Sequence, residues 1–118
     1  MPSDLIHFDE FLRVDIRVGQ VTAAEPFPKA RKSAYKLWID FGTEVGTKQS
    51  SAQITEHYTP EDLVGRKVLA VVNLAPRQVA DFMSECLTLG VYDAQEQVRL
   101  IGLPDQAATD VPLGARLC

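Results

Sequence analysis

The residues in this sequence best suited to chemistry are cations grouped in one short stretch. Four of them follow one another with no acid between them: Lys29, Arg31, Lys32 and Lys36. Clustered cations can bind phosphate groups locally even when the whole protein is acidic. A solvated loop would also explain them. The stretch is therefore a candidate phosphate contact, with a plain loop as the alternative.

A second candidate is a run of polar residues with the pattern of a strand, Lys48-Gln49-Ser50-Ser51-Ala52-Gln53. Successive strand residues face opposite sides, so some of these groups must point inward or line a groove. Because a buried polar group without a partner is costly, these groups either satisfy one another or contact a ligand. A polar edge strand is the remaining explanation. The candidate binding residues of this run are Lys48, Gln49, Ser50 and Ser51.

A third candidate lies around the turn at Pro76. Asn73 could cap the turn or hydrogen-bond the edge of a base. Arg77 could bind phosphate or stack on a base. If the stretch is helical, Arg77 could instead pair with Asp81, four residues on. Gln78 and Ser84 complete this set of candidates.

Signatures of catalysis and of metal binding are missing from the sequence. His7 and His57 are its only histidines, and neither stands in a metal-binding spacing. Cys86 precedes alternating strand residues and is expected to be buried, while Cys118 is the last residue. The sequence has no P-loop, GxGxxG or GxSxG motif. We therefore predict no catalytic residue, no metal and no cofactor, and we expect that the protein is not an enzyme.

Short strands dominate the elements that must position these candidates. Apolar and polar residues alternate from Val14 to Val18, in a strand that continues to Ala23, and Gly19 suggests a bulge or a bend. Tyr35–Phe41 is the clearest strand, and for Trp38 on its far face we favour packing or an interface over base stacking. Further strands are expected at Thr47–Ile54, Lys67–Val72, Cys86–Tyr92 and Val98–Ile101.

Helices are expected to be few and short. His7–Leu12 has the spacing of one helix, and a second begins at Thr59, with Pro60 in its first turn and Gly65 at its end. Gly42–Gly46 is interpreted as a hairpin connection, and Asn73–Met83 as irregular or briefly helical.

This order of elements predicts an all-β fold. Five or six short strands with a helix between the third and the fourth are typical of a five-stranded Greek-key barrel of the OB type. Short helices and N- and C-terminal extensions would complete it. The length of 118 residues fits a single domain covering residues 1–118.

Composition places the chain among ordinary folded proteins, with 46% hydrophobic and 24% charged residues. Its net charge of −4 argues at first sight against nucleic acid. However, residues 29–77 hold eight basic and five acidic side chains, so the acidity lies mostly elsewhere. The longest apolar stretch, Val68–Val72, is too short for membrane insertion. An acidic start and two cysteines without a pairing motif favour a cytoplasmic location.

Several segments resemble the tRNA-binding domain family, an OB-fold module appended to methionyl- and phenylalanyl-tRNA synthetases. The segments occur in the order and spacing of that family: Val14–Gly19, Lys48–Ile54, Tyr58–Gly65, Val72–Arg77 and Met83–Glu85. The resemblance runs from about Phe8 to the C-terminus. Together with KQSSAQI, the segment Ala24–Lys32 is similar to the free-standing CsaA-type members, which are export-related chaperones.

The resemblance implies a homodimer built through the terminal extensions, without catalysis. Its CsaA-type members imply a molecular chaperone of protein export that binds unfolded or pre-export polypeptides. The alternative is a protein that binds tRNA or other structured RNA on the basic face of the barrel. The resemblance places the following residues on or near the face turned to nucleic acid: Lys29, Arg31, Lys32, Lys48, Ser50, Asn73, Arg77 and Ser84.

Overall fold

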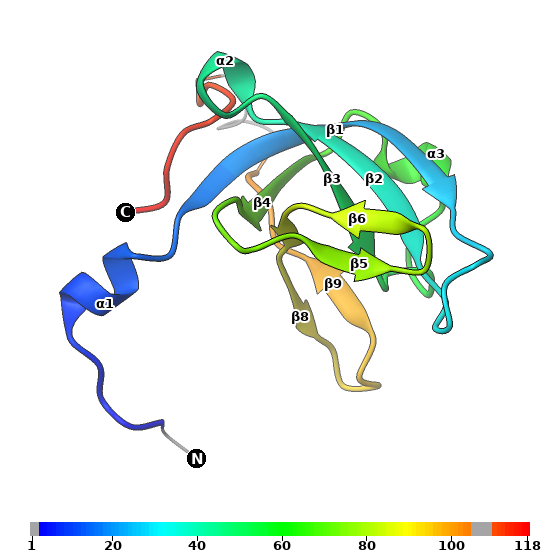
Figure 1. Cartoon of the computed structure of the whole chain (residues 1–118), viewed down its shortest axis with the longest axis horizontal. Helices are drawn as coiled ribbons and strands as arrows, with labels where there is room; N and C mark the ends of the chain where they lie inside the picture. Colours follow the sequence, from blue (N-terminus) through cyan, green and yellow to red (C-terminus); the bar gives the residue numbers. More distant parts are fainter. Residues whose placement is uncertain (1–2, 105–109) are drawn as a thin grey trace.

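The computed structural model describes residues 3–104 and 110–118, and an antiparallel barrel forms its centre (Figure 1). The strands of the barrel bond in the order β3-β2-β1-β4-β7. Their bounds are β1 (Ile16–Pro26), β2 (Tyr35–Asp40), β3 (Thr47–Ala52), β4 (Lys67–Val71) and β7 (Leu87–Thr88). The sheet curls until β3 lies near β7, and the short helix α3 (Pro60–Leu63) lies between β3 and β4 in the chain. The all-β fold of OB type predicted from the sequence is confirmed.

The bulge of β1 and its glycine occupy different places, although the sequence suggested a bulge or a bend at Gly19. The pairing of β1 with β2 shifts register between Val21 and Ala23, not at Gly19. Gly19 instead permits close packing, since a Cβ there would lie 2.5 Å from Cγ2 of Ile39. Val14, predicted to begin the strand, precedes it and is exposed.

The predicted hairpin connection between β2 and β3 is a single helical turn, α2 (Gly42–Val45). The carboxylate of Asp40 accepts a hydrogen bond from the backbone N–H of Gly42 at 2.8 Å, and Gly46 ends the turn with a φ of 82°. The predicted start of α3 is confirmed. The Thr59 hydroxyl accepts from the backbone N–H of Asp62 at 3.2 Å, which caps the first turn.

Two small hairpins extend from the barrel, and both differ from the sequence prediction. Within the stretch expected to be irregular or helical, β5 (Arg77–Val79) pairs with β6 (Phe82–Ser84). The expected strand Cys86–Tyr92 is divided between β7 and β8 (Gly90–Tyr92), and β8 pairs with β9 (Val98–Leu100). Leu87 and Val91 are about half exposed. The chain therefore leaves the barrel after β7 instead of continuing in it.

The apolar side chains form two separate clusters. The larger fills the barrel and includes Leu37, Ile39, Phe41, Leu63 and Val68, all of them buried. The smaller lies outside it, between the β5–β6 hairpin and the segment after β1, and is built on Phe27, Ala34 and Phe82. This second cluster determines where the hairpin lies, because burial of large apolar side chains is the main favourable term in packing.

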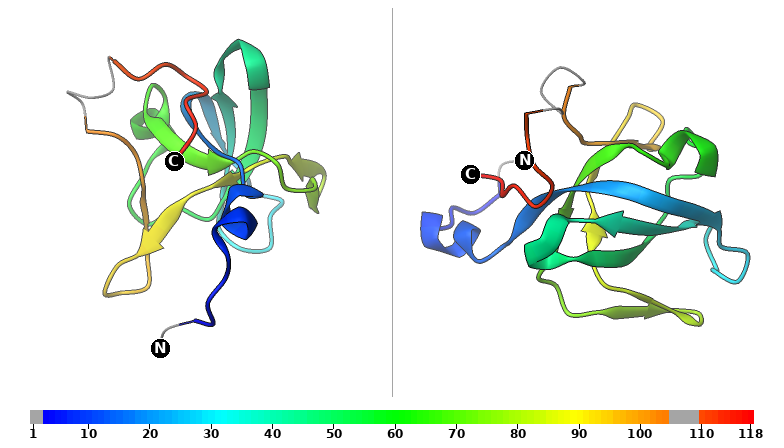
Figure 2. Two further views of the ribbon diagram at one scale, coloured as in Figure 1. Left: turned by 90° about the vertical axis from the view of Figure 1, so that its left-hand side faces the viewer. Right: turned by 90° about the horizontal axis from the view of Figure 1, so that it is seen from above.

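The two ends of the described chain behave differently (Figure 2). Residues 3–14, with the short helix α1 (Phe8–Leu12), project away from the barrel, and the exposed fraction of their apolar side chains reaches 99% at Leu5 and 71% at Phe8. The C-terminal segment instead lies along β1, where backbone hydrogen bonds join Val18 to Ala115 and Ile16 to Leu117. None of the helices in the described residues is long and apolar enough to span a membrane.

Candidate nucleic-acid interface

The basic loop (residues 27–34) and the β5–β6 hairpin face each other across a surface hollow of about 600 Å³. The side chains that line it come from the loop, the hairpin and the end of the β3 segment: Ala30, Arg31, Lys32, Ala34, Gln53, Arg77, Gln78, Val79 and Ala80. Among the described residues this lining holds cations and amides and no carboxylate. We name it the cationic hollow.

An aromatic cluster of Phe27, Trp38 and Phe82 holds the two walls of the cationic hollow in place. The ring of Phe82 lies 5.5 Å from that of Phe27 and 5.9 Å from that of Trp38, edge to face in both pairs. Such pairs are stabilising beyond the area that they bury. One residue of the hairpin, Phe82, therefore fixes the hairpin to the loop and to β2. Trp38 packs in this cluster, which is the role that we favoured for it from the sequence.

Two of the candidate cations are engaged by side chains around this cluster. Lys29 donates to the Asp81 carboxylate at 2.8 Å, and this hydrogen bond raises the pKa of Lys29 and lowers that of Asp81. The ammonium of Lys36 lies over the rings of Phe27 and Phe82, at 4.8 and 5.4 Å from their centres. Because Lys29 pairs with Asp81, and because the segment is a hairpin, the helical pair Arg77–Asp81 considered from the sequence does not form.

Three other candidate cations are left available. Within residues 3–104 and 110–118, the side chains of Arg31, Lys32 and Arg77 make no ion pair and no hydrogen bond. All three line the cationic hollow, and all three are exposed. Like charges gathered in a concave surface raise the local potential and attract anions. The amide of Gln78, at the same hollow, donates to the carbonyl of Ala80 at 3.0 Å.

A second hollow, of about 400 Å³, adjoins the first on the other side of Arg77. Gln53, Arg77 and Val79 line both hollows. The remaining lining is Ser51, Leu74, Ala75, Ser84, Glu85, Cys86 and Leu87. Leu74 and Leu87 are each about half exposed, so they offer uncovered apolar surface. We name this the aliphatic hollow.

The polar run of β3 is mostly satisfied by the segment that covers its open edge. The amide of Gln49 donates to the carbonyl of Met83 at 2.8 Å, and the backbone N–H of Ser51 donates to the Ser84 hydroxyl at 3.0 Å. Ser50 is 1% exposed and accepts from the Thr88 hydroxyl at 3.0 Å. Its placement on a binding face is therefore wrong, because it closes the barrel between β3 and β7. Of the three explanations offered for the run, internal hydrogen bonding holds for these groups, although their partners lie in β6 and β7 and not in the run itself.

The remaining candidates lie outside both hollows. Lys48 lies in β3 opposite Ile39. The amide of Asn73 is used by the start of β1, since it donates to the carbonyl of Arg13 at 2.7 Å and accepts from the N–H of Asp15 at 2.9 Å. Asn73 therefore joins the end of β4 to the N-terminal segment.

Several lining residues were not singled out from the sequence. Gln53 ends the polar run and was noted only as part of it, whereas Leu74, Val79 and Leu87 carry no local signal of a surface hollow. Burial raises the pKa of Cys86, at the floor of the aliphatic hollow, to about 11, so its thiol stays protonated. No group of three or more His, Cys, Asp or Glu suited to a metal occurs in the described parts of the chain.

Most of the chain, including the whole barrel, matches a known family. A family model described as "Putative tRNA binding domain" matches residues 16–112. The chain belongs to the tRNA-binding domain family. The matched range includes the basic loop, the polar run of β3 and the β5–β6 hairpin, so the resemblance identified from the sequence is confirmed.

Relatives of two kinds share this domain. The methionine–tRNA ligase of Methanococcus aeolicus is 36% identical over 115 residues, which are 98% of this chain but only 16% of that protein. The crystal structure of the chaperone CsaA from Bacillus anthracis is 46% identical and superposes with a TM-score of 0.86, over 98% of this chain and 100% of that one. A MetRS-related protein from Pyrococcus horikoshii is 31% identical, with a TM-score of 0.84 over 98% and 100%.

Proposed function

We propose that this protein binds structured RNA, such as tRNA, through the phosphate groups that its cationic hollow can hold. The observation that carries the proposal is the convergence of Arg31, Lys32 and Arg77 on one concave surface without a carboxylate among its described lining residues. Guanidinium groups match phosphate geometry and remain charged at any physiological pH. Contacts of this kind position an RNA backbone and carry little sequence information. Membership of the tRNA-binding domain family supports the same ligand.

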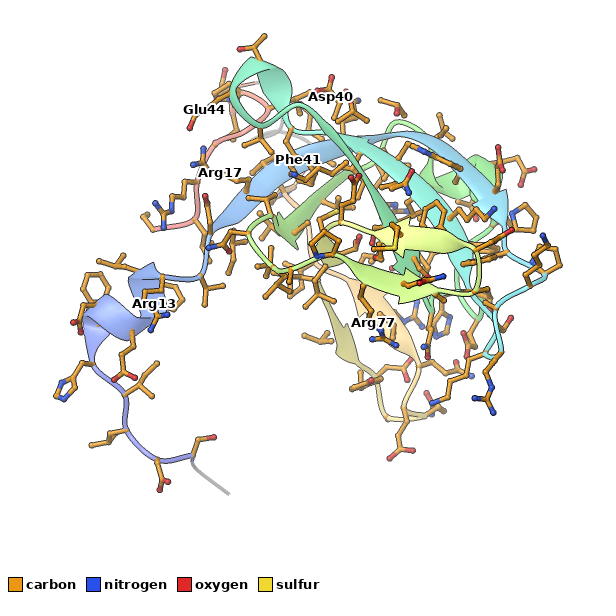
Figure 3. The ribbon with its side chains drawn as sticks, in the orientation of Figure 1. Arg13, Arg17, Asp40, Phe41, Glu44 and Arg77 are labelled. Carbon is orange, nitrogen blue, oxygen red and sulfur yellow. The ribbon has the colours of Figure 1, made fainter. Side chains whose placement is uncertain are left out.

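The test is the salt dependence of RNA binding, compared between the protein and the triple variant R31A/K32A/R77A. The slope of log affinity against log salt falls by about 0.7 to 0.9 for every phosphate group that the protein no longer neutralises. We expect the variant to show a slope about two units smaller and an affinity about a hundredfold weaker at low salt. Arg13→Ala is the control. It removes an exposed cation from the projecting N-terminal segment, far from Arg77 (Figure 3), and should change neither the slope nor the affinity. An unchanged slope in the triple variant would refute the proposal.

We also propose that the protein is a homodimer joined through its N-terminal segment. Leu5, Ile6 and Phe8 are mostly exposed on a segment that projects from the barrel. Apolar side chains in such a position gain free energy when a second copy covers them. In sedimentation velocity at micromolar concentration we expect a dimer, and Phe8→Asp should shift it toward the monomer. A monomeric parent protein would refute this part of the proposal.

A second candidate function is that of a chaperone that binds unfolded or pre-export polypeptides. The specific observation is exposed apolar surface at Met83, Val91 and Tyr92, which could hold extended apolar segments. The similarity to the CsaA chaperone structure supports it. The protein should then slow the aggregation of an unfolded client, and Tyr92→Ser should weaken this effect while leaving RNA affinity unchanged. An inert protein in that assay would count against the chaperone.

We propose further that the protein acts by binding alone, without catalysis, and in the cytoplasm. Cys86 and Cys118 are both free thiols, as is usual in a reducing compartment.

A further inference from the structure

The two hollows form one continuous site with unlike ends. They share Gln53, Arg77 and Val79, so the side chain of Arg77 borders both. One end adds Arg31 and Lys32, and the other adds Leu74 and Leu87. A ligand that covers both ends must therefore carry negative charge next to a flat or apolar body.

Charge also orients that ligand. Glu85 lines the aliphatic hollow, and one of its carboxylate oxygens accepts from the backbone N–H of Gln49 at 3.0 Å. Asp81, in the turn of the hairpin, is paired with Lys29. A phosphate is consequently attracted to the cationic hollow and repelled from the end near Glu85. The uncharged part of the ligand then lies against the leucines.

We infer that this site holds one unpaired nucleotide of an RNA strand, with Arg77 between its two halves. Arg31, Lys32 and Arg77 hold its phosphate, and its base lies in the aliphatic hollow against Leu74 and Leu87. This inference rests on the proposed RNA-binding function and specifies the form of RNA bound. A base can enter a hollow of about 400 Å³ only when it is unpaired and turned out of its stack. The guanidinium plane of Arg77 provides a surface for stacking, which a lysine would not.

A nucleotide fits this site better than a polypeptide segment does. The cationic hollow contains three positive charges without a partner among the described residues. An RNA strand carries a negatively charged phosphate next to each base, so a nucleotide can place its phosphate in the cationic hollow and its base in the aliphatic hollow. An apolar polypeptide would cover the leucines but leave these cations uncompensated. The apolar surface and the charge together therefore favour the nucleotide.

The experiment compares three probes of equal length by fluorescence anisotropy: a single-stranded RNA, the same strand with abasic residues, and a blunt duplex. Abasic residues keep every phosphate and remove the bases. We expect the intact strand to bind about tenfold more tightly than the abasic strand, in line with the effect of removing one stacked base. In Leu87→Ser the intact and the abasic strand should bind with nearly equal affinity, because the substitution replaces the apolar wall of the base site. Val64→Ser, at a similarly exposed valine directly after α3, should preserve the difference between the two strands.

Arg77→Lys sharpens the test, since it keeps the charge and removes the planar group. It should lower the ratio of intact to abasic affinity while the salt slope stays nearly constant. Thermal unfolding of each variant confirms that the chain is folded before binding is measured. A Leu87→Ser chain that fails to fold is replaced by Leu74→Ser, at the same hollow.

Two results would overturn the inference. If intact and abasic strands bind equally, and the triple variant R31A/K32A/R77A binds neither, then the phosphate contacts stand and the base site does not exist. A second result would be an uncharged apolar peptide that binds the protein, loses affinity in Leu87→Ser and yet displaces no RNA. The aliphatic hollow would then bind polypeptides and not a base. Affinities that do not depend on salt for any probe would instead refute the proposed function itself.

Discussion

The cations at the start of β1 and those of the cationic hollow have opposite surroundings (Figure 3). The side chain of Arg17 is 14% exposed and donates to Asp15 at 2.7 Å, to the carbonyl of Gly114 at 3.0 Å and to Glu44 at 3.4 Å. Arg116 reaches the same Asp15 carboxylate at 3.4 Å. Arg77, exposed on β5, has no such partner among the described residues.

This difference shows that a cation serves either the fold or a ligand according to its partners, not its type. The hydrogen bond from Arg17 lowers the pKa of Asp15, so the pair is committed to joining β1 and the C-terminal segment. Arg31, Lys32 and Arg77 make no such bonds within the described chain, and their positions depend instead on the aromatic cluster beneath them. Each region can therefore be disturbed without the other.

The largest expected effect on stability comes from Phe82→Ala, which removes the ring that joins the hairpin to the loop. Truncating a buried phenylalanine costs about 3 to 4 kcal/mol of unfolding free energy. RNA affinity should fall as well, because the hairpin that carries Arg77 is no longer fixed. Urea denaturation and anisotropy measure the two effects. Tyr92→Ala, at a ring that is 76% exposed, is the matched control and should not lower stability.

Arg17→Ala disturbs the cations that serve the fold. It leaves the Asp15 carboxylate and the Gly114 carbonyl with fewer donors in a partly buried place, at a cost of about 2 kcal/mol in unfolding free energy, measured by urea denaturation. Arg17→Lys keeps the charge without the bidentate contact, so its unfolding free energy should lie between those of the parent protein and Arg17→Ala. RNA affinity should not change in either variant. Arg31→Ala should instead lower RNA affinity and leave the unfolding free energy unchanged. Similar decreases of RNA affinity in Arg17→Ala and Arg31→Ala would show that the two groups of cations do not differ in role.

Sequence reasoning could predict the barrel because the signals of its elements are local. Tyr35–Phe41 alternates apolar and polar residues, and Thr59-Pro60 marks the start of α3 between β3 and β4, so order and type follow from short patterns. The β5–β6 hairpin could not be found in this way. Its turn contains no Asn-Gly or other hairpin signal, and Ala80 takes the left-handed conformation, with a φ of 52°.

The sequence could predict which charged residues gather at the candidate site. It could not predict which of them remain unpaired and able to bind a ligand. The sequence grouped Lys29, Arg31 and Lys32 equally, but an ion pair across 52 positions commits Lys29 to Asp81. Ser50 looked like its polar neighbours in β3, yet barrel closure buries it against Thr88. Both outcomes depend on tertiary contacts between distant segments, which no local pattern contains.

Asp81→Asn removes the acidic partner of Lys29. Lys29 belongs to the basic loop but is ion-paired, as Arg17 is. Because the Lys29–Asp81 pair is exposed, the substitution should leave the unfolding free energy nearly unchanged. The freed ammonium adds to the field of the cationic hollow, so RNA affinity, measured by anisotropy, should rise about twofold. Glu61→Gln removes an exposed acid from α3 and is the control for net charge alone. An equal rise in both variants would mean that only net charge matters.

The smallest effect is the acid dependence of the Asp15 contacts. The folded pKa of Asp15 lies below its ordinary value of 3.8, because Arg17 donates a hydrogen bond to the carboxylate. The stabilisation is therefore complete above that value and disappears as the pH falls through the folded pKa. The difference in unfolding free energy between the protein and Asp15→Asn should be constant from about pH 5 to 7 and shrink below about pH 4. Asp81 and Asp93 also have lowered pKa values, but both are present in the two proteins and cancel in the difference. A difference that stays constant to lower pH would show that Asp15 acts on the fold through its shape and not its charge.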